Sequence, residues 1–144
     1  MNLPQPIVLL ALLAACTAAA AQSTVVAAED ARFVPLDLRA PDGAAIALLW
    51  GDPAGGPSAM LLRLPKGPLP LHVHSSTYHL MLMRGTMKHW DEDGTEAAAR
   101  PLGPGSYWRQ PGGQTHGDAC LSDDCLVHLV WDGKRDAYRP PPKP

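Results

Sequence analysis

The chain has 144 residues, of which 12 are Lys or Arg and 14 are Asp or Glu, so its formal net charge is -2. This balance provides no basic surface for nucleic acid and no polybasic patch for an anionic membrane. A chain of this length forms one domain with one modest core, and its 16 Pro and 13 Gly interrupt it too often for long helices. The composition therefore favours a small all-β domain with many turns.

The first 21 residues have the pattern of an export signal. Residues 7–15 are an apolar run that is too short to cross about 30 Å of hydrocarbon but suits the apolar region of a signal peptide. Three alanines before Gln22 supply the small residues that a signal peptidase requires. We therefore expect a signal peptide at 1–21, a linker at 22–32 and no transmembrane span.

A second interpretation of the same segment predicts a lipid anchor. Residues 13–16, Leu-Ala-Ala-Cys, resemble a bacterial lipobox, in which Cys16 is lipidated and becomes the first residue of the mature protein. Both interpretations place the protein in the periplasm, either soluble or membrane-anchored. Intact-mass spectrometry distinguishes them, because an unmodified start at Gln22 excludes acylation.

From Phe33 onward the chain is a series of short apolar runs that end at turn residues. The run 59–64 stops at Pro-Lys-Gly-Pro, and the run 87–90 meets Asp-Glu-Asp-Gly at 91–94, which is typical of a hairpin turn. So many short strands predict a sandwich or closed barrel over residues 33–138, followed by an extended Pro-rich tail at 139–144. The expected strands are 45–50, 59–64, 80–83, 87–90, 106–109 and 126–131.

Three histidines have the spacing of metal ligands. His72 and His74 are two residues apart on an extended segment, so their side chains project from the same face and can reach one ion. Turn residues between Gly105 and Gly113 return the chain and place His116 as a third imidazole. We expect these histidines to bind one divalent transition metal.

Two cysteines remain after Cys16 is removed with the leader or lipidated. Cys120 and Cys125 are an even pair in an oxidising compartment, so we expect them to form a disulfide. Their spacing lacks the second half of a structural zinc site and is not the Cys-x-x-Cys of a thiol oxidoreductase.

The histidine segments resemble the two motifs of the cupin superfamily. Residues 105–116 match the second motif, Gly-x5-Pro-x-Gly-x2-His, up to its last position, where Cys120 replaces Asn. Residues 72–85 carry the His-x-His and the final Gly of the first motif, although four residues, and not five, lie between Gly67 and His72. The resemblance implies a single jelly-roll β-barrel, similar to small exported bacterial cupins without an assigned function.

The cupin pattern also includes a Glu ligand in the first motif, and this chain lacks it. The position falls on Tyr78 when counted back from Gly85 and on His79 when counted forward from His74. Strand alternation points Tyr78 inward. We nevertheless favour His79 as the fourth ligand, because neutral imidazole binds divalent transition metals readily and a phenol with a pKa of about 10 usually does not.

Three further residues are expected around the metal. Gln114, two residues before His116, is a candidate donor to an oxygen bound at the metal. Asp118 is a candidate to orient His116 by a hydrogen bond. Trp108 is expected to pack in the core or at the rim of the pocket.

The predicted ligands do not determine which metal is bound or which reaction is catalysed. Imidazole suits Zn, Fe, Mn, Ni and Cu, and cupins host many chemistries. One hypothesis is an enzyme of oxygenase, isomerase or hydrolase type that acts on a small oxygenated or anionic molecule, with Arg84 and Arg109 as candidates to hold the anion. The other is a non-catalytic periplasmic metal-binding, ligand-binding or sensor protein. The resemblance also implies a homodimer formed through sheet edges.

Overall fold

The structure is a computed structural model that describes residues 22–140. The expected signal peptide, the lipobox with Cys16 and the end of the Pro-rich tail lie outside the described residues. The described part contains seven strands and one short 3-10 helix, and none of its helices is long and apolar enough to cross a membrane. The elements are η1 (Ala28–Asp30), β1 (Val34–Pro35), β2 (Ala45–Gly51), β3 (Ser58–His72), β4 (Tyr78–Arg84), β5 (Met87–Asp91), β6 (Tyr107–Gln110) and β7 (His116–Trp131).

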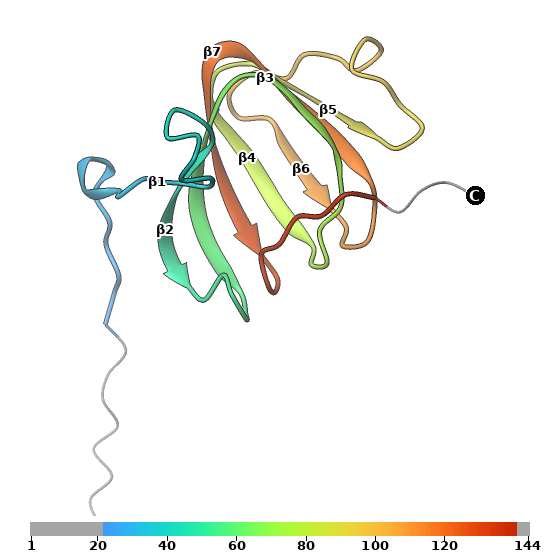
Figure 1. The fold of residues 1–144 in the computed structure, drawn as a ribbon. Coiled ribbons are helices and arrows are strands. Elements are labelled where there is room, and N and C mark those ends of the chain that lie inside the picture. The colour runs from blue at the N-terminus through green and yellow to red at the C-terminus, as the bar shows by residue number, and fades with distance from the viewer. Residues whose placement is uncertain (1–21, 141–144) are drawn as a thin grey trace, which may run out of the picture.

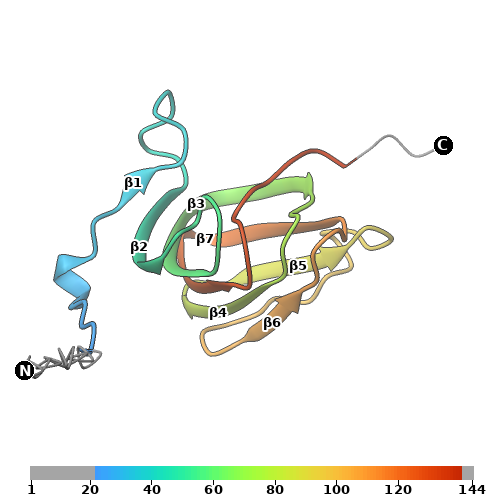
Figure 2. The same ribbon diagram turned by 90° about the horizontal axis from the view of Figure 1, so that it is seen from below.

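The strands form one antiparallel sheet around the long pair β3 and β7. Its order is β1-β2-β3-β7-β4-β6, with β5 also paired to β7. Along one edge, β7 pairs with β3 from Ser58–Trp131 to His72–His116. The other edge pairs with β5 near its start and with β4 near its end. Figures 1 and 2 show β3 and β7 as curved ribbons that run the length of the domain. The all-β prediction is confirmed.

Alternation along the strands decides which side chains enter the core. In β4, Tyr78, Leu80 and Leu82 are buried, whereas Met81 and Met83 are exposed. This period of two is the geometry of a strand with one face against the core. The core is closed by apolar side chains from the facing strands, among them Met60, Leu64, Met87, Val127, Leu129 and Trp131.

The two long strands extend beyond the expected runs. The strand that contains the run 59–64 does not end at the proline-rich segment that follows this run. It is β3, which continues to His72. Its pairing with β7 shifts register between Pro65 and Gly67, and Gly67 has a φ of 137°. Prolines lack the N–H that a regular ladder uses, so they are tolerated at an irregularity in the pairing. The Pro-Lys-Gly-Pro segment is therefore an irregularity inside β3 and not the end of a strand.

The expected hairpin after residues 87–90 is reduced to one antiparallel bridge, between Met87 and Leu102. A turn is present, since the Gly94 N–H donates to the Asp91 carbonyl at 2.8 Å. However, β5 pairs with β7, and the next strand in the chain, β6, pairs with β4. Long-range pairing across the sheet thus outweighs the local turn signal.

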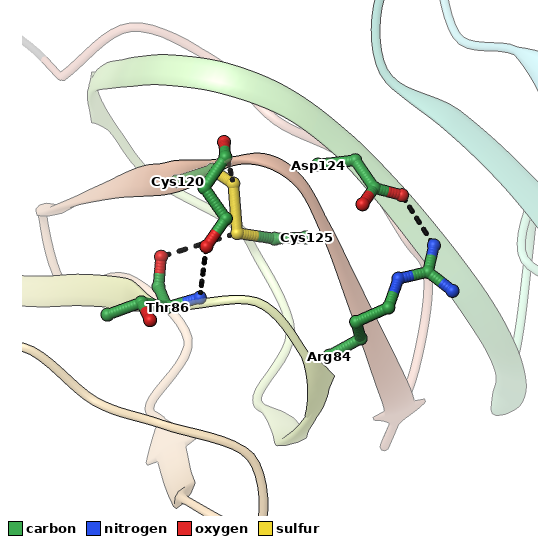
Figure 3. Close-up of a disulfide and its surroundings, with 6 residues drawn as sticks. Arg84, Thr86, Cys120, Asp124 and Cys125 are labelled. Carbon is green, nitrogen blue, oxygen red and sulfur yellow. Dashed lines mark hydrogen bonds and ion pairs between the residues drawn. A yellow bond between two sulfur atoms is a disulfide. The ribbon is translucent and has the colours of Figure 1, made fainter.

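The predicted disulfide is confirmed, and it closes the bend of β7. Cys120 and Cys125 are bonded. Opposite them, Gly67 pairs with Cys120 and Pro65 pairs with Asp124, so β7 carries more residues than β3 over this stretch. Figure 3 shows the disulfide beside Thr86, whose N–H donates to the Ser122 hydroxyl at 3.0 Å. The cross-link therefore holds the extra residues of the bulge in place.

Removal of this cross-link is expected to lower stability moderately. The sequence separation of the cysteines is 5, and for so short a loop the chain-entropy model gives about 2 kcal/mol. The double variant Cys120→Ala/Cys125→Ala should therefore unfold at a lower urea concentration than the oxidised wild type. Coincident unfolding curves would show that the disulfide does not contribute.

Candidate metal centre

The ends of β3 and β7 bring three histidines together, as the sequence predicts. His72 is the last residue of β3 and pairs with His116, the first residue of β7. His74 lies two residues after His72 on the same face. One nitrogen from each ring lies within 4.8 Å of the others, and the rings of His72 and His116 have centroids 4.3 Å apart. This three-histidine group has the size of a centre that binds one ion.

Backbone carbonyls hold all three histidine rings in the same tautomer, with a proton on Nδ1. A carbonyl oxygen only accepts a hydrogen bond, so a ring nitrogen that contacts it must carry the proton. In each ring this nitrogen is Nδ1, which leaves Nε2 unprotonated, as in histidines that bind metals. The acceptors are Pro70 O for His72 (2.8 Å), Gln114 O for His116 (3.2 Å) and Asp136 O for His74.

Burial keeps the rings of His74 and His116 neutral. It lowers the pKa of His74 to about 4, and the neighbouring His72 and His116 lower it further, against the opposing hydrogen bond to Asp136. Burial also lowers the pKa of His116. Neutral imidazoles with free Nε2 atoms are the form that binds divalent transition metals. The residues present therefore fit the metal that the sequence predicts.

Tyr78, and not His79, lies beside the three histidines, which corrects the preference for His79. The Tyr78 hydroxyl donates to His116 Nε2 at 3.1 Å, and burial raises the pKa of this phenol well above its ordinary value. His79 is the next residue along β4 and points to the other face, where its Nδ1 bonds with the Tyr107 hydroxyl at 2.8 Å. Strand alternation therefore outweighs the ligand preference of imidazole.

Gln114 has another place than expected, whereas Trp108 packs in the core as predicted. The Gln114 side chain is exposed, and it is the backbone carbonyl of this residue that contacts His116. Trp108 is buried and stacks on the His89 ring, with centroids 5.2 Å apart. It does not contribute to the wall of the cavity described below.

Asp118 is a buried carboxylate next to the three histidines. Its Oδ1 accepts a hydrogen bond from His89 Nδ1 at 2.8 Å, and its Oδ2 lies 3.8 Å from His116 Nε2. Asp118 thus fixes the orientation of His89, whereas Gln114 fixes that of His116. Its negative charge raises the pKa of His116 and His74, against the effect of burial.

A cavity of about 400 Å³ that is partly open to solvent lies beside this group. Its polar wall contains His72, His74, Tyr78 and Asp118. Most of the remaining wall is apolar, including Leu62, Leu64, Leu69, Leu80 and Leu129. A cavity of this size and lining has the character of a small-molecule site.

The C-terminal segment 132–139, called the strap below, also contributes to the cavity wall, which the sequence did not indicate. Val73 and Tyr138 exchange two backbone hydrogen bonds of 3.0 Å. The Asp136 carboxylate accepts from Ser75 N at 2.8 Å and from Ser75 Oγ at 2.6 Å. These contacts hold Arg135, Ala137 and Tyr138 against the cavity.

The arginines expected to hold an anion lie elsewhere. Arg84 forms an exposed ion pair with Asp124, which Figure 3 shows beside the disulfide. Arg109 is exposed on β6, at a position paired with His79. The arginines that line the cavity are Arg135 and Arg139 of the strap.

Loss of the Asp118 charge is expected to weaken metal binding. Asp118→Asn keeps an oxygen for His89 but removes the negative charge next to His116, and changes of this kind typically cost about 10- to 100-fold in affinity. Competition with a chromophoric chelator measures the effect. The matched control is Asp124→Asn on the surface, and equal affinities of the two variants would contradict the prediction.

Comparison with solved structures identifies the fold. The fold is similar to an RmlC-like cupin from Shewanella frigidimarina NCIMB 400, with a TM-score of 0.62 and 16% identity over 80% of this chain and 95% of that one. It is also similar to the polyketide cyclase RemF from Streptomyces resistomycificus, with a TM-score of 0.65 and 19% identity over 82% and 85% of the two chains. These likenesses confirm the predicted cupin jelly roll.

A third similar structure is the DMSP lyase DddQ from Ruegeria pomeroyi DSS-3, with a TM-score of 0.60 and 20% identity over 76% of this chain and 60% of that one. At such identities the likeness concerns the fold alone. Residues 24–132 match the model of DUF4437, a domain of unknown function, and the chain belongs to this family. No curated protein sequence matches the chain.

Proposed function

We propose that this protein binds one divalent transition metal through the Nε2 atoms of His72, His74 and His116, and that the cavity beside the metal takes a small oxygenated or anionic molecule. The observation that carries the proposal is that each of the three neighbouring rings is held by a carbonyl at Nδ1, which leaves Nε2 as the ligand atom. Such carbonyl contacts orient metal-binding histidines in general.

The surroundings of the site support a role in chemistry. A metal held by neutral ligands keeps its full positive charge and acts as a Lewis acid toward oxygen atoms. Tyr78 supplies a buried phenol that stays protonated and can donate a hydrogen bond. Asp118 supplies a carboxylate within 3.8 Å of His116 that can accept a proton. The cupin-like neighbours named as a lyase and a cyclase act on small molecules, which is consistent with this role.

A non-catalytic metal-binding, ligand-binding or sensor protein is the second candidate, and one observation favours it. The three-histidine group contains no carboxylate, and the neighbouring Asp118 already accepts a hydrogen bond from His89. A base that is engaged in this way is less available to a substrate.

Calorimetric titration of the metal-free protein with Zn²⁺, Fe²⁺, Mn²⁺, Ni²⁺ and Cu²⁺ tests the proposal. We expect one site per chain for at least one of these ions. Absence of saturable binding by all five ions from a folded protein would overturn it. With the preferred metal bound, oxygen consumption and the hydrolysis or isomerisation of small carboxylates then separate an enzyme from a binding protein.

We also propose that the protein is exported to the periplasm. The disulfide between Cys120 and Cys125 supports this location, because such bonds persist in oxidising compartments. Fractionation of cells that express the full chain, followed by intact-mass analysis, tests it. Recovery of an uncleaved chain in the cytoplasm would contradict it.

A further inference from the structure

The strap places one partly buried guanidinium in the wall of the cavity. Arg135 lines the cavity together with His72 and His74. The other arginines in the described part of the chain pair with a carboxylate, lie over an aromatic ring or are exposed. Hydrogen bonds and ion pairs of the described residues do not involve the Arg135 guanidinium. A partly buried cation of this kind favours an anionic partner.

The acidic side chains next to Arg135 in the chain and in the cavity wall, those of Asp136 and Asp118, hydrogen-bond with other partners. Both carboxylate oxygens of Asp136 accept hydrogen bonds from Ser75. Asp118, which also lines the cavity, accepts from His89. Burial lowers the pKa of Arg135 and the charge of Asp136 opposes this, but a guanidinium stays protonated throughout the physiological range. The positive charge therefore remains available to a bound molecule.

Arg135 precedes the strap residue that holds His74. The carbonyl of the next residue, Asp136, accepts the hydrogen bond of His74 Nδ1. The Arg135 backbone is itself fixed, because its N–H donates to Pro53 O at 2.9 Å. A carboxylate bound by Arg135 would therefore lie at the polar end of the cavity, while the rest of the molecule faces the leucines of the wall.

We propose that the cavity binds an amphipathic carboxylate, with its carboxylate on Arg135 and its apolar body against Leu62, Leu64, Leu80 and Leu129. A guanidinium offers two parallel N–H groups that match the two oxygens of a carboxylate. The apolar wall favours a hydrocarbon body over a sugar-like one. This inference rests on the proposed function only in that the ligand then lies beside the metal, and it names the class of that ligand.

The test is calorimetric titration of the metal-free protein with octanoate, with octan-1-ol and octylamine as analogues of equal chain length. Octanoate should bind, and both analogues should bind at least about tenfold more weakly. Arg135→Gln should lower the affinity for octanoate by about tenfold or more, and Arg135→Lys should retain part of this affinity. The control Arg109→Gln should bind octanoate as the wild type does. Circular dichroism and unfolding midpoints confirm that each variant folds.

Two results would overturn the inference: no binding of octanoate to the wild type, or equal binding to wild type and a folded Arg135→Gln variant. Repetition of the metal titration on the same samples separates this inference from the proposed function. A protein that binds octanoate through Arg135 but no metal contradicts only the proposed function. A protein that binds metal, but binds octanoate independently of Arg135, contradicts only this inference.

Discussion

Replacement of His116 by Ala is expected to abolish stoichiometric metal binding. His116 is fully buried beside His72 and Tyr78, and its Nε2 is one of the three proposed ligand atoms. A site reduced from three protein ligands to two no longer holds a divalent ion against dialysis. The metal content measured by elemental analysis should fall from about one ion per chain to less than about 0.1. Because the loss of a buried ring can also affect folding, the partly exposed His72→Ala is the parallel variant and should lose metal too.

The matched control is His79→Ala. His79 is adjacent to Tyr78 on β4 but bonds with Tyr107 on the opposite face. This variant should therefore retain metal at the level of the wild type. Loss of metal from His79→Ala, or full retention by a folded His72→Ala, would show that the ion is bound elsewhere.

Gly85→Ala is expected to cause a large loss of stability. Gly85 has a φ of 88°, and a Cβ on it would lie 2.7 Å from Asp124 O and 2.8 Å from Cys125 Sγ. The left-handed backbone alone costs an L-residue about 1–2 kcal/mol. The clash involves backbone and a cross-linked sulfur, which cannot move aside, so the total should be about 3 kcal/mol or more.

Two other glycines separate the two contributions to this loss of stability, which are the left-handed backbone and the steric clash of the added Cβ. Gly105 has a φ of 85° but nothing within 4 Å of an added Cβ, so Gly105→Ala should cost only about 1–2 kcal/mol. Gly103 has free space and no left-handed φ, so Gly103→Ala should be nearly neutral. Urea unfolding of the three variants measures the series. Equal midpoints for Gly85→Ala and Gly103→Ala would contradict the described turn.

The fold class and several strands follow from the sequence because burial on a sheet imposes a period of two. The expected runs 45–50 and 87–90 correspond closely to β2 and β5. Their partners were not predictable from local signals: β5 pairs with β7 across the sheet, and β3 passes through its proline-rich segment at a bulge. Pairing at a distance depends on the whole core and not on the residues at one turn.

The candidate site was predictable where spacing determines geometry. His72 and His74 share a face because they are two residues apart, and His116 pairs with His72 across strands. The preference for His79 failed because ligand chemistry was given more weight than alternation. The strap was missed because its contacts are remote: Asp136 is 62 residues from His74, and no motif marks that segment.

Anomalous diffraction tests the central claim most directly. Crystals of the metal-free protein would be soaked in Zn²⁺, and data collected on both sides of the zinc absorption edge. One strong peak per chain is expected, about 2.0–2.1 Å from Nε2 of each of His72, His74 and His116. A peak near His79 and Asp132, which lie 3.7 Å apart, or no peak in a crystal that diffracts well, would contradict the proposed site.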